Sequence, residues 1–130
     1  MNDGQWRTFF ETAGQVLGKG HRAANMSESW CAWTTFSRLA ADAGYWKAGL
    51  PNADELRATS IVDGGTWGQP FSYHELAHLI VPRTFEQEFV GDGQYRCVQR
   101  QQDTEELSRR LAENGINHRK TDLILEIKLF

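Results

Sequence analysis

The sequence contains little cysteine and proline, and it has no long apolar run. Its two cysteines, Cys31 and Cys97, do not have the spacing of metal ligands, and one pair provides no disulfide framework. No segment reaches the roughly 20 consecutive apolar residues that a membrane-spanning helix needs. Residues 1–14 include Asp3 and contain no apolar core, so we expect no signal peptide and a reducing cytoplasm as the compartment.

An excess of positive charge is also absent. The chain has 14 Lys and Arg residues against 17 Asp and Glu, a net charge of −3. Proteins that bind a phosphate backbone usually present a basic face, so the composition predicts no direct binding of nucleic acid. The length of 130 residues fits one domain over residues 1–130. The five Trp and seven Phe residues predict an ordered core.

Three segments have the pattern of helices. Asn2 and Gln5 form a capping-box pattern before an apolar stripe that ends at Gly18. A second helix is predicted to stop at Gly44, and a third to begin at Asp103 and end at Gly115. The stripe of the first contains Trp6, Phe9, Phe10, Ala13, Val16 and Leu17, and that of the second Trp30, Trp33, Phe36, Leu39, Ala40 and Ala43.

Strand signals occupy the second half of the chain. Residues 60–67 (SIVDGGTW) have the turn glycines of a tight hairpin, and Asp92-Gly93 predicts a second hairpin between residues 85–89 and 95–100. The alternating residues 122–130 (DLILEIKLF) predict a strand within a sheet. Together these patterns predict an α+β fold with a mainly antiparallel sheet, N-terminal helices and one late helix packed on it.

Residues 71–89 contain His74, Glu75 and His78 in the H-E-x-x-H order of zinc proteases. If this stretch is a helix, His74 and His78 lie one turn apart on a zinc ion, and Glu75 activates the attacking water. The third ligand of the longer zinc-protease motifs does not follow. The chain would then be a small zinc-dependent hydrolase.

A strand fits the same stretch better. Leu79, Ile80 and Val81 form a β-rich apolar run that Pro82 closes, and strand signals follow directly. His74 and His78 would then lie on the same face of a sheet, without a metal. We therefore favour a strand, no cofactor and no metal site, with zinc expected only if the helix forms.

No other catalytic pattern is convincing. Cys97 and His118 are a nucleophile and a base by type, but neither lies in a motif. A cluster of basic residues near the last helix alternates with acids and predicts a solvated helix face. The sequence therefore favours a binding protein over an enzyme. A small-molecule-binding domain remains an alternative, and it would need an apolar pocket with convergent polar groups.

Two segments, residues 75–86 (ELAHLIVPRTFE) and residues 102–130 (QDTEELSRRLAENGINHRKTDLILEIKLF), resemble those of small bacterial immunity proteins. Proteins of that class neutralise polymorphic or contact-dependent toxins. The resemblance implies a cytoplasmic protein, a monomer or a weak dimer, that binds one toxin domain, such as a basic nuclease, and covers its active site.

An acidic surface would speed and orient the encounter with a basic toxin. The candidate residues are acids on the predicted hairpin, acids on the last helix and two loop tryptophans that could anchor the partner. In chain order these are Trp46, Trp67, Glu86, Glu88, Asp92, Glu105 and Glu106.

Overall fold

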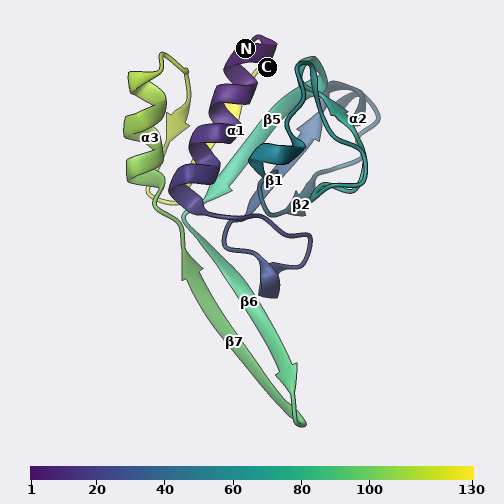
Figure 1. The fold of residues 1–130 in the computed structure, drawn as a ribbon, viewed down its shortest axis with the longest axis vertical. Helices are drawn as coiled ribbons and strands as arrows, with labels where there is room; N and C mark the ends of the chain where they lie inside the picture. The colour runs from purple at the N-terminus through teal and green to yellow at the C-terminus, as the bar shows by residue number, and fades with distance from the viewer.

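A five-stranded antiparallel sheet forms the centre of the computed structural model, which describes residues 1–130. Helices α1 (Asp3–Leu17) and α3 (Thr104–Glu113) lie side by side over one face of this sheet (Figure 1). In the order β2-β1-β5-β9-β8, the strands are β2 (Trp46–Ala48), β1 (Cys31–Thr35), β5 (Leu76–Pro82), β9 (Ile124–Lys128) and β8 (Arg119–Lys120). The prediction of an α+β fold with a mainly antiparallel sheet is confirmed.

Helix α1 forms where its capping residues and apolar stripe predict. The Asn2 side chain accepts a hydrogen bond from the Gln5 backbone, and the Gln5 side chain accepts one from the Asn2 backbone. The helix ends at Gly18, whose φ of 96° suits a residue without a side chain. Its buried face consists of Trp6, Phe9, Phe10, Thr12, Ala13 and Leu17.

Local signals also predict the two C-terminal elements. In front of α3, the Asp103 side chain accepts a hydrogen bond from the Glu106 backbone, and Gly115 ends the helix region with a φ of 69°. Strand β9 alternates as expected, so Leu125 and Ile127 are buried in the core. The core joins this face of the sheet to α1 and α3.

The predicted second helix through Trp30 and Trp33 is wrong. Residues 31–35 form β1, and only a short helix, α2 (Phe36–Ala40), follows. Strand β1 pairs with β2 on one side and with β5 on the other. These long-range pairings outweigh the helical spacing of the tryptophans. Trp33 is buried in the core from its position on β1, so a strand buries this side chain as well as a helix would.

The predicted hairpin at residues 60–67 is also wrong. Strand β3 (Ser60–Ile61) pairs with β4 (Phe71–Ser72), and the intervening loop carries Trp67 back into the core. Three short 3-10 helices complete the body: η1 (Ala24–Met26), η2 (Ala53–Glu55) and η3 (Tyr73–Glu75). None of the helices has both the length and the apolar character needed to cross a bilayer.

A β-hairpin extends away from this body (Figure 1). It consists of β6 (Thr84–Gly91) and β7 (Gln94–Gln101), which pair only with each other. The two turn residues, Asp92 and Gly93, have φ of 51° and 74°, as a two-residue hairpin turn requires. The predicted hairpin is therefore confirmed, and it is called the arm below.

Candidate partner-binding surface

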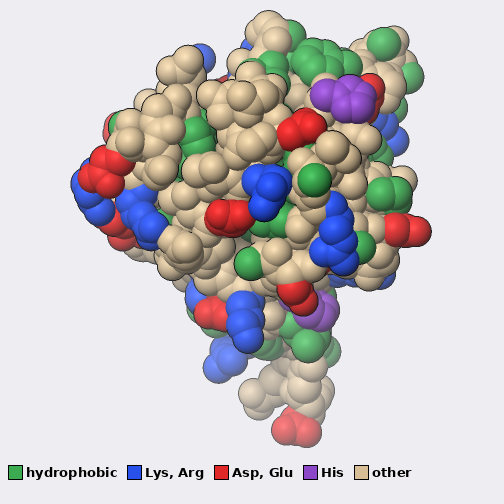
Figure 2. Space-filling view, turned by 45° about the horizontal axis from the view of Figure 1, so that its top comes forward, with side chains coloured by type: hydrophobic (Ala, Val, Ile, Leu, Met, Phe, Trp, Pro, Cys, Tyr) green, Lys and Arg blue, Asp and Glu red, His purple; other side chains and the backbone are tan.

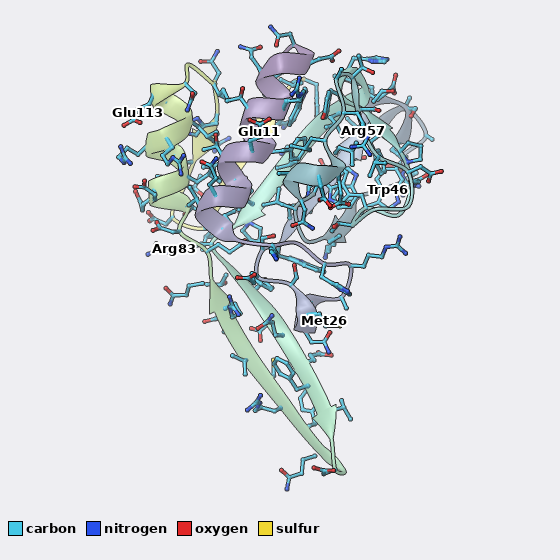
Figure 3. All side chains as sticks on the ribbon, viewed as in Figure 1. Glu11, Met26, Trp46, Arg57, Arg83 and Glu113 are labelled. Carbon is cyan, nitrogen blue, oxygen red and sulfur yellow. The ribbon has the colours of Figure 1, made fainter.

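The base of the arm is fixed to the body. Phe85 is buried and its ring stacks on that of Trp30, with centroids 5.8 Å apart. The Gln87 amide donates hydrogen bonds to two backbone oxygens beside η1, those of Ala24 at 2.7 Å and Ser27 at 2.8 Å. Figure 3 shows Met26 on η1 close to the arm. These contacts set the direction in which the rest of the arm points.

The outer half of the arm is open to solvent. Val90 is 81% exposed and Tyr95 is 63% exposed. In the space-filling view the arm is a narrow projection below the body (Figure 2). An exposed valine and tyrosine side by side on a projection are available to another molecule.

The two faces of the arm carry different charges. Strand alternation and the β6–β7 register place Glu86, Glu88 and Val90 on one face, opposite Gln99, Cys97 and Tyr95. This face, called the acidic face, has no Lys or Arg. Arg96 and Arg100 lie on the other face, where the Arg96 guanidinium sits 4.9 Å from the centre of the Phe89 ring. Asp92 adds a further carboxylate at the turn.

Hydrogen bonds hold the side chains of the acidic face. The Tyr95 hydroxyl donates to Glu88 at 3.1 Å, and the Cys97 thiol donates to Glu86 at 2.7 Å. The bond to Glu88 is the main cause that raises the pKa of Tyr95 to about 12. In the same way the bond to Glu86 raises the pKa of the Cys97 thiol. Both donors therefore stay neutral near pH 7 and leave the face negative.

The other predicted acids lie on the body, at the start of α3, and are already paired. Glu105 accepts a hydrogen bond from Lys120 at 2.7 Å, and Glu106 accepts two from Arg109, at 2.5 and 3.0 Å. These cations are the leading causes that lower the pKa values of the two carboxyls. Their charge is compensated within the chain, whereas no cation lies on the acidic face.

The predicted aromatic anchors are packing residues. Trp67 is 6% exposed, its ring stacks on Trp33 at 3.7 Å, and its indole N–H donates to the Gly49 oxygen at 3.0 Å. The prediction that Trp67 lies at the surface is wrong, because its ring is packed in the core. Trp46 is half-buried in β2, and the Arg38 guanidinium lies 4.2 Å from the centre of its ring. The exposed apolar residues of the arm, Val90 and Tyr95, were missed, although alternation from Glu86 and Glu88 would have located them.

The stretch with the zinc-protease pattern is extended. His74 lies in η3 with its side chain 74% exposed, whereas His78 is buried in β5. The expected strand through Leu79, Ile80 and Val81 is confirmed as part of β5, but the two histidines do not share a face of it, because His74 precedes the strand. The helical turn that would bring both rings to one zinc ion is absent. No group of three or more His, Cys, Asp or Glu side chains is arranged to hold a metal ion.

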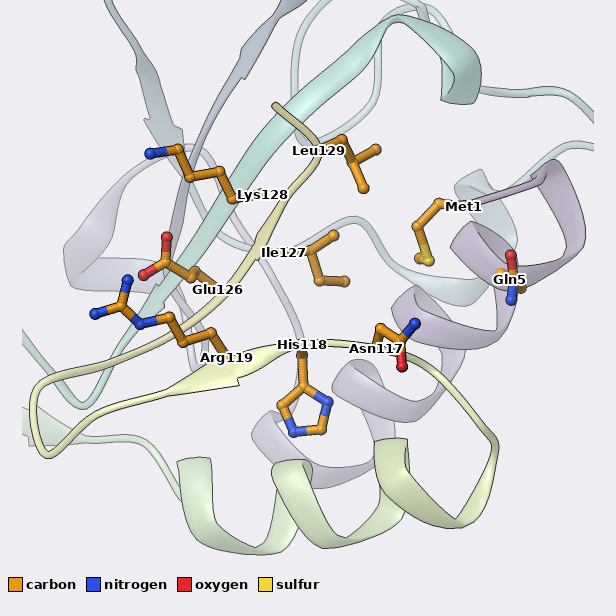
Figure 4. Close-up of a pocket in the computed structure, with 9 residues that line it drawn as sticks. All are labelled: Met1, Gln5, Asn117, His118, Arg119, Glu126, Ile127, Lys128 and Leu129. Atoms are coloured by element: carbon orange, nitrogen blue, oxygen red, sulfur yellow. The ribbon is translucent and has the colours of Figure 1, made fainter.

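The hollows on the body are open to solvent, and few of the residues that line them are hydrophobic. One hollow, with a volume of about 420 Å³, lies beside the N-terminus and β9 (Figure 4). Met1, Ile127 and Leu129 are the only apolar residues among the nine that line it. Both ring nitrogens of His118, in the wall of this hollow, already have hydrogen-bond partners within the chain. Nε2 lies 2.7 Å from the Ser108 hydroxyl, and Nδ1 lies 2.9 Å from the Ile116 oxygen. This hollow lacks the apolar lining of a typical small-molecule site.

The sequence matches no known protein-family model, and no curated protein and no solved structure is significantly similar to the chain.

Proposed function

We propose that this protein is a cytoplasmic immunity protein that binds one bacterial toxin domain and covers its active site with the arm. One observation carries the proposal. Glu86 and Glu88 lie beside the exposed Val90 and Tyr95 on the acidic face, which has no cation of its own. Apolar contact in the middle of an interface supplies affinity, while charge around it selects the partner.

The packing of the arm supports a binding role. Only Phe85 and Gln87, both near its base, are buried, and an isolated two-stranded hairpin is at best marginally stable in water. A partner that covers the outer half would remove its apolar side chains from water. The arm is therefore a better candidate for a docking element than for a part of the core.

The charge of the arm favours a basic partner. Toxins that cut nucleic acids hold the phosphate backbone with Lys and Arg, and Glu86 and Glu88 would compete with phosphate for those side chains. Each strand of the arm has 8 residues, which corresponds to roughly 27 Å at about 3.4 Å per residue. That length is sufficient to reach into an active-site cleft and exclude the substrate.

The test is protection from a toxin. The protein encoded immediately upstream of this gene, tested as the candidate toxin, is co-expressed with the wild-type chain or with a short-arm variant. In that variant Asn-Gly replaces residues 88–97 and joins Gln87 to Val98, which are paired in the arm. We expect growth and a stable complex with the wild type, and neither with the short arm.

The matched control changes only the other face, with Arg96→Gln and Arg100→Gln. We expect this variant to protect as well as the wild type. Protection by the short-arm variant, or an upstream gene whose product does not bind the wild-type chain, would contradict the proposal.

A further inference from the structure

The two edges of the arm differ in what lies beside them. Helix η1 and the residue after it lie on the β6 side, where the Ala24 and Ser27 oxygens accept the hydrogen bonds of Gln87, while nothing lies beside β7 (Figure 1). Outside the two-stranded ladder, no backbone group of residues 84–101 has a hydrogen-bond partner in the chain. A free strand edge of this length is a template for pairing with another strand.

The turn determines which backbone groups of β7 are free. Because Asp92 and Gly93 form a two-residue turn, Gly91 and Gln94 are the closing hydrogen-bonded pair of the ladder. In an antiparallel ladder, alternate residues turn their N–H and C=O groups outward. On β7 these residues are Tyr95, Cys97 and Gln99.

We propose that a second copy of the chain docks on this edge. The β7 strands of the two copies then pair antiparallel, with the twofold axis at Cys97. This register places Arg96 opposite Val98 and Tyr95 opposite Gln99, so no like charges meet. A register centred on Val98 would place Arg96 of one copy opposite Arg100 of the other, and a register centred on Arg96 would place the two Arg96 side chains opposite each other. Like charges directly opposite each other destabilise a strand pair. Among the registers that avoid this repulsion, the one centred on Cys97 pairs the most residues of β7 (Gln94–Gln101), so β7 favours it.

The pairing creates a larger acidic surface. Residues directly opposite each other lie on the same face of a sheet, so the twofold axis places both acidic faces on one side of a four-stranded sheet β6-β7-β7-β6. One arm, about 27 Å long and about 10 Å wide, offers roughly 270 Å², well below the about 800 Å² per partner of a typical stable interface. The dimer doubles that contact area to roughly 540 Å², closer to the typical size, so contacts from the bodies would have to add the rest. The pairing itself does not depend on the toxin proposed above.

Sedimentation of the purified chain over a wide concentration range tests the pairing. Gln99→Pro removes an outward N–H and no bond of the arm itself, whereas the matched variant Gln99→Ala loses the same side chain and keeps the N–H. We expect a concentration-dependent dimer for the wild type and Gln99→Ala, and a monomer for Gln99→Pro. A wild type that stays monomeric, or a dimer unaffected by Gln99→Pro, would overturn the proposal.

Chemical coupling gives a second readout that does not depend on how Gln99→Pro folds. In the proposed register the two Cys97 thiols lie directly opposite each other, and Cys31 is buried and out of reach of the reagent. A short bis-maleimide should therefore link two wild-type chains rapidly and should leave Cys97→Ser unlinked. Linkage of the wild type no faster than that of a monomeric thiol protein at the same concentration would contradict pairing about Cys97.

Discussion

At the scale of single residues, His78 links the exposed Tyr45 to the buried Glu126 by hydrogen bonds. Tyr45 lies 2.6 Å from His78 Nδ1, and Glu126 lies 2.9 Å from Nε2. Burial, followed by the charge of Glu126, raises the pKa of Tyr45, so its hydroxyl keeps its proton and can donate to Nδ1 when Nε2–H donates to the carboxylate. The position that resembled a zinc ligand thus keeps a buried Glu126 paired within the sheet.

His78→Ala should consequently destabilise the fold. The substitution leaves the Glu126 carboxylate, which is only 7% exposed, without its hydrogen-bond partner. Removing one member of a buried pair lowers the free energy of unfolding by about 3 kcal/mol, because the other member stays buried and unpaired. The matched control is His74→Ala, which removes the exposed histidine of the same motif and should change stability by less than about 0.5 kcal/mol. Urea denaturation of both variants measures the difference, and equal losses would contradict the assigned role.

The Cys97 thiol offers a second test at this scale. Its pKa is raised chiefly because the thiol donates to Glu86, and deprotonation would lose that bond and place a thiolate beside a carboxylate. Glu86→Gln should therefore lower the pKa of Cys97 towards its ordinary value and move the pH–rate curve for alkylation by iodoacetamide to lower pH. The buried Cys31 contributes little to this signal, which Cys97→Ser verifies. An unchanged curve would show that Glu86 does not control the thiol.

At the scale of elements, the arm is separable from the body. Residues 88–97, which the short-arm variant removes, include none of the buried core residues, and the Asn-Gly turn can close the Gln87–Val98 pair. We expect this variant to unfold cooperatively at nearly the temperature of the wild type, as measured by circular dichroism. A large loss of stability would mean that the outer arm supports the body, and the failure of this variant to protect cells would then have a trivial cause.

The elements that the sequence predicts correctly are those with local signals. Helix α1 has Asn2 and Gln5 at its start, and the arm has Asp92-Gly93 at its turn. Strand β1 was predicted as a helix because its state depends on pairing with β2 and β5, which are distant in sequence. The burial of Trp67 likewise follows from its stack on Trp33, which no local pattern reveals. The sequence predicts the acids of the arm as candidates. Their position on the face opposite Arg96 and Arg100 follows only from the pairing register of β6 and β7.

At the scale of the whole molecule, charge distribution matters more than net charge. Glu86→Lys with Glu88→Lys, and Glu105→Lys with Glu106→Lys, change the net charge of −3 by the same amount. Only the first pair reverses a face that has no cations, because Glu105 and Glu106 already bond Lys120 and Arg109. If local charge steers the encounter with a basic toxin domain, reversal on the arm should slow association at low salt by at least about tenfold and flatten its salt dependence.

Reversal on α3 should have a much smaller effect on the same association rate, which stopped-flow fluorescence or biolayer interferometry can measure. Steering by net charge would slow both double variants equally, because both have the same formal charge. Equal slowing would thus remove the acidic face from its proposed role even if the toxin still bound. Slowing confined to the arm variant would assign the recognition charge to Glu86 and Glu88, because the two double variants differ only in where the charge is reversed.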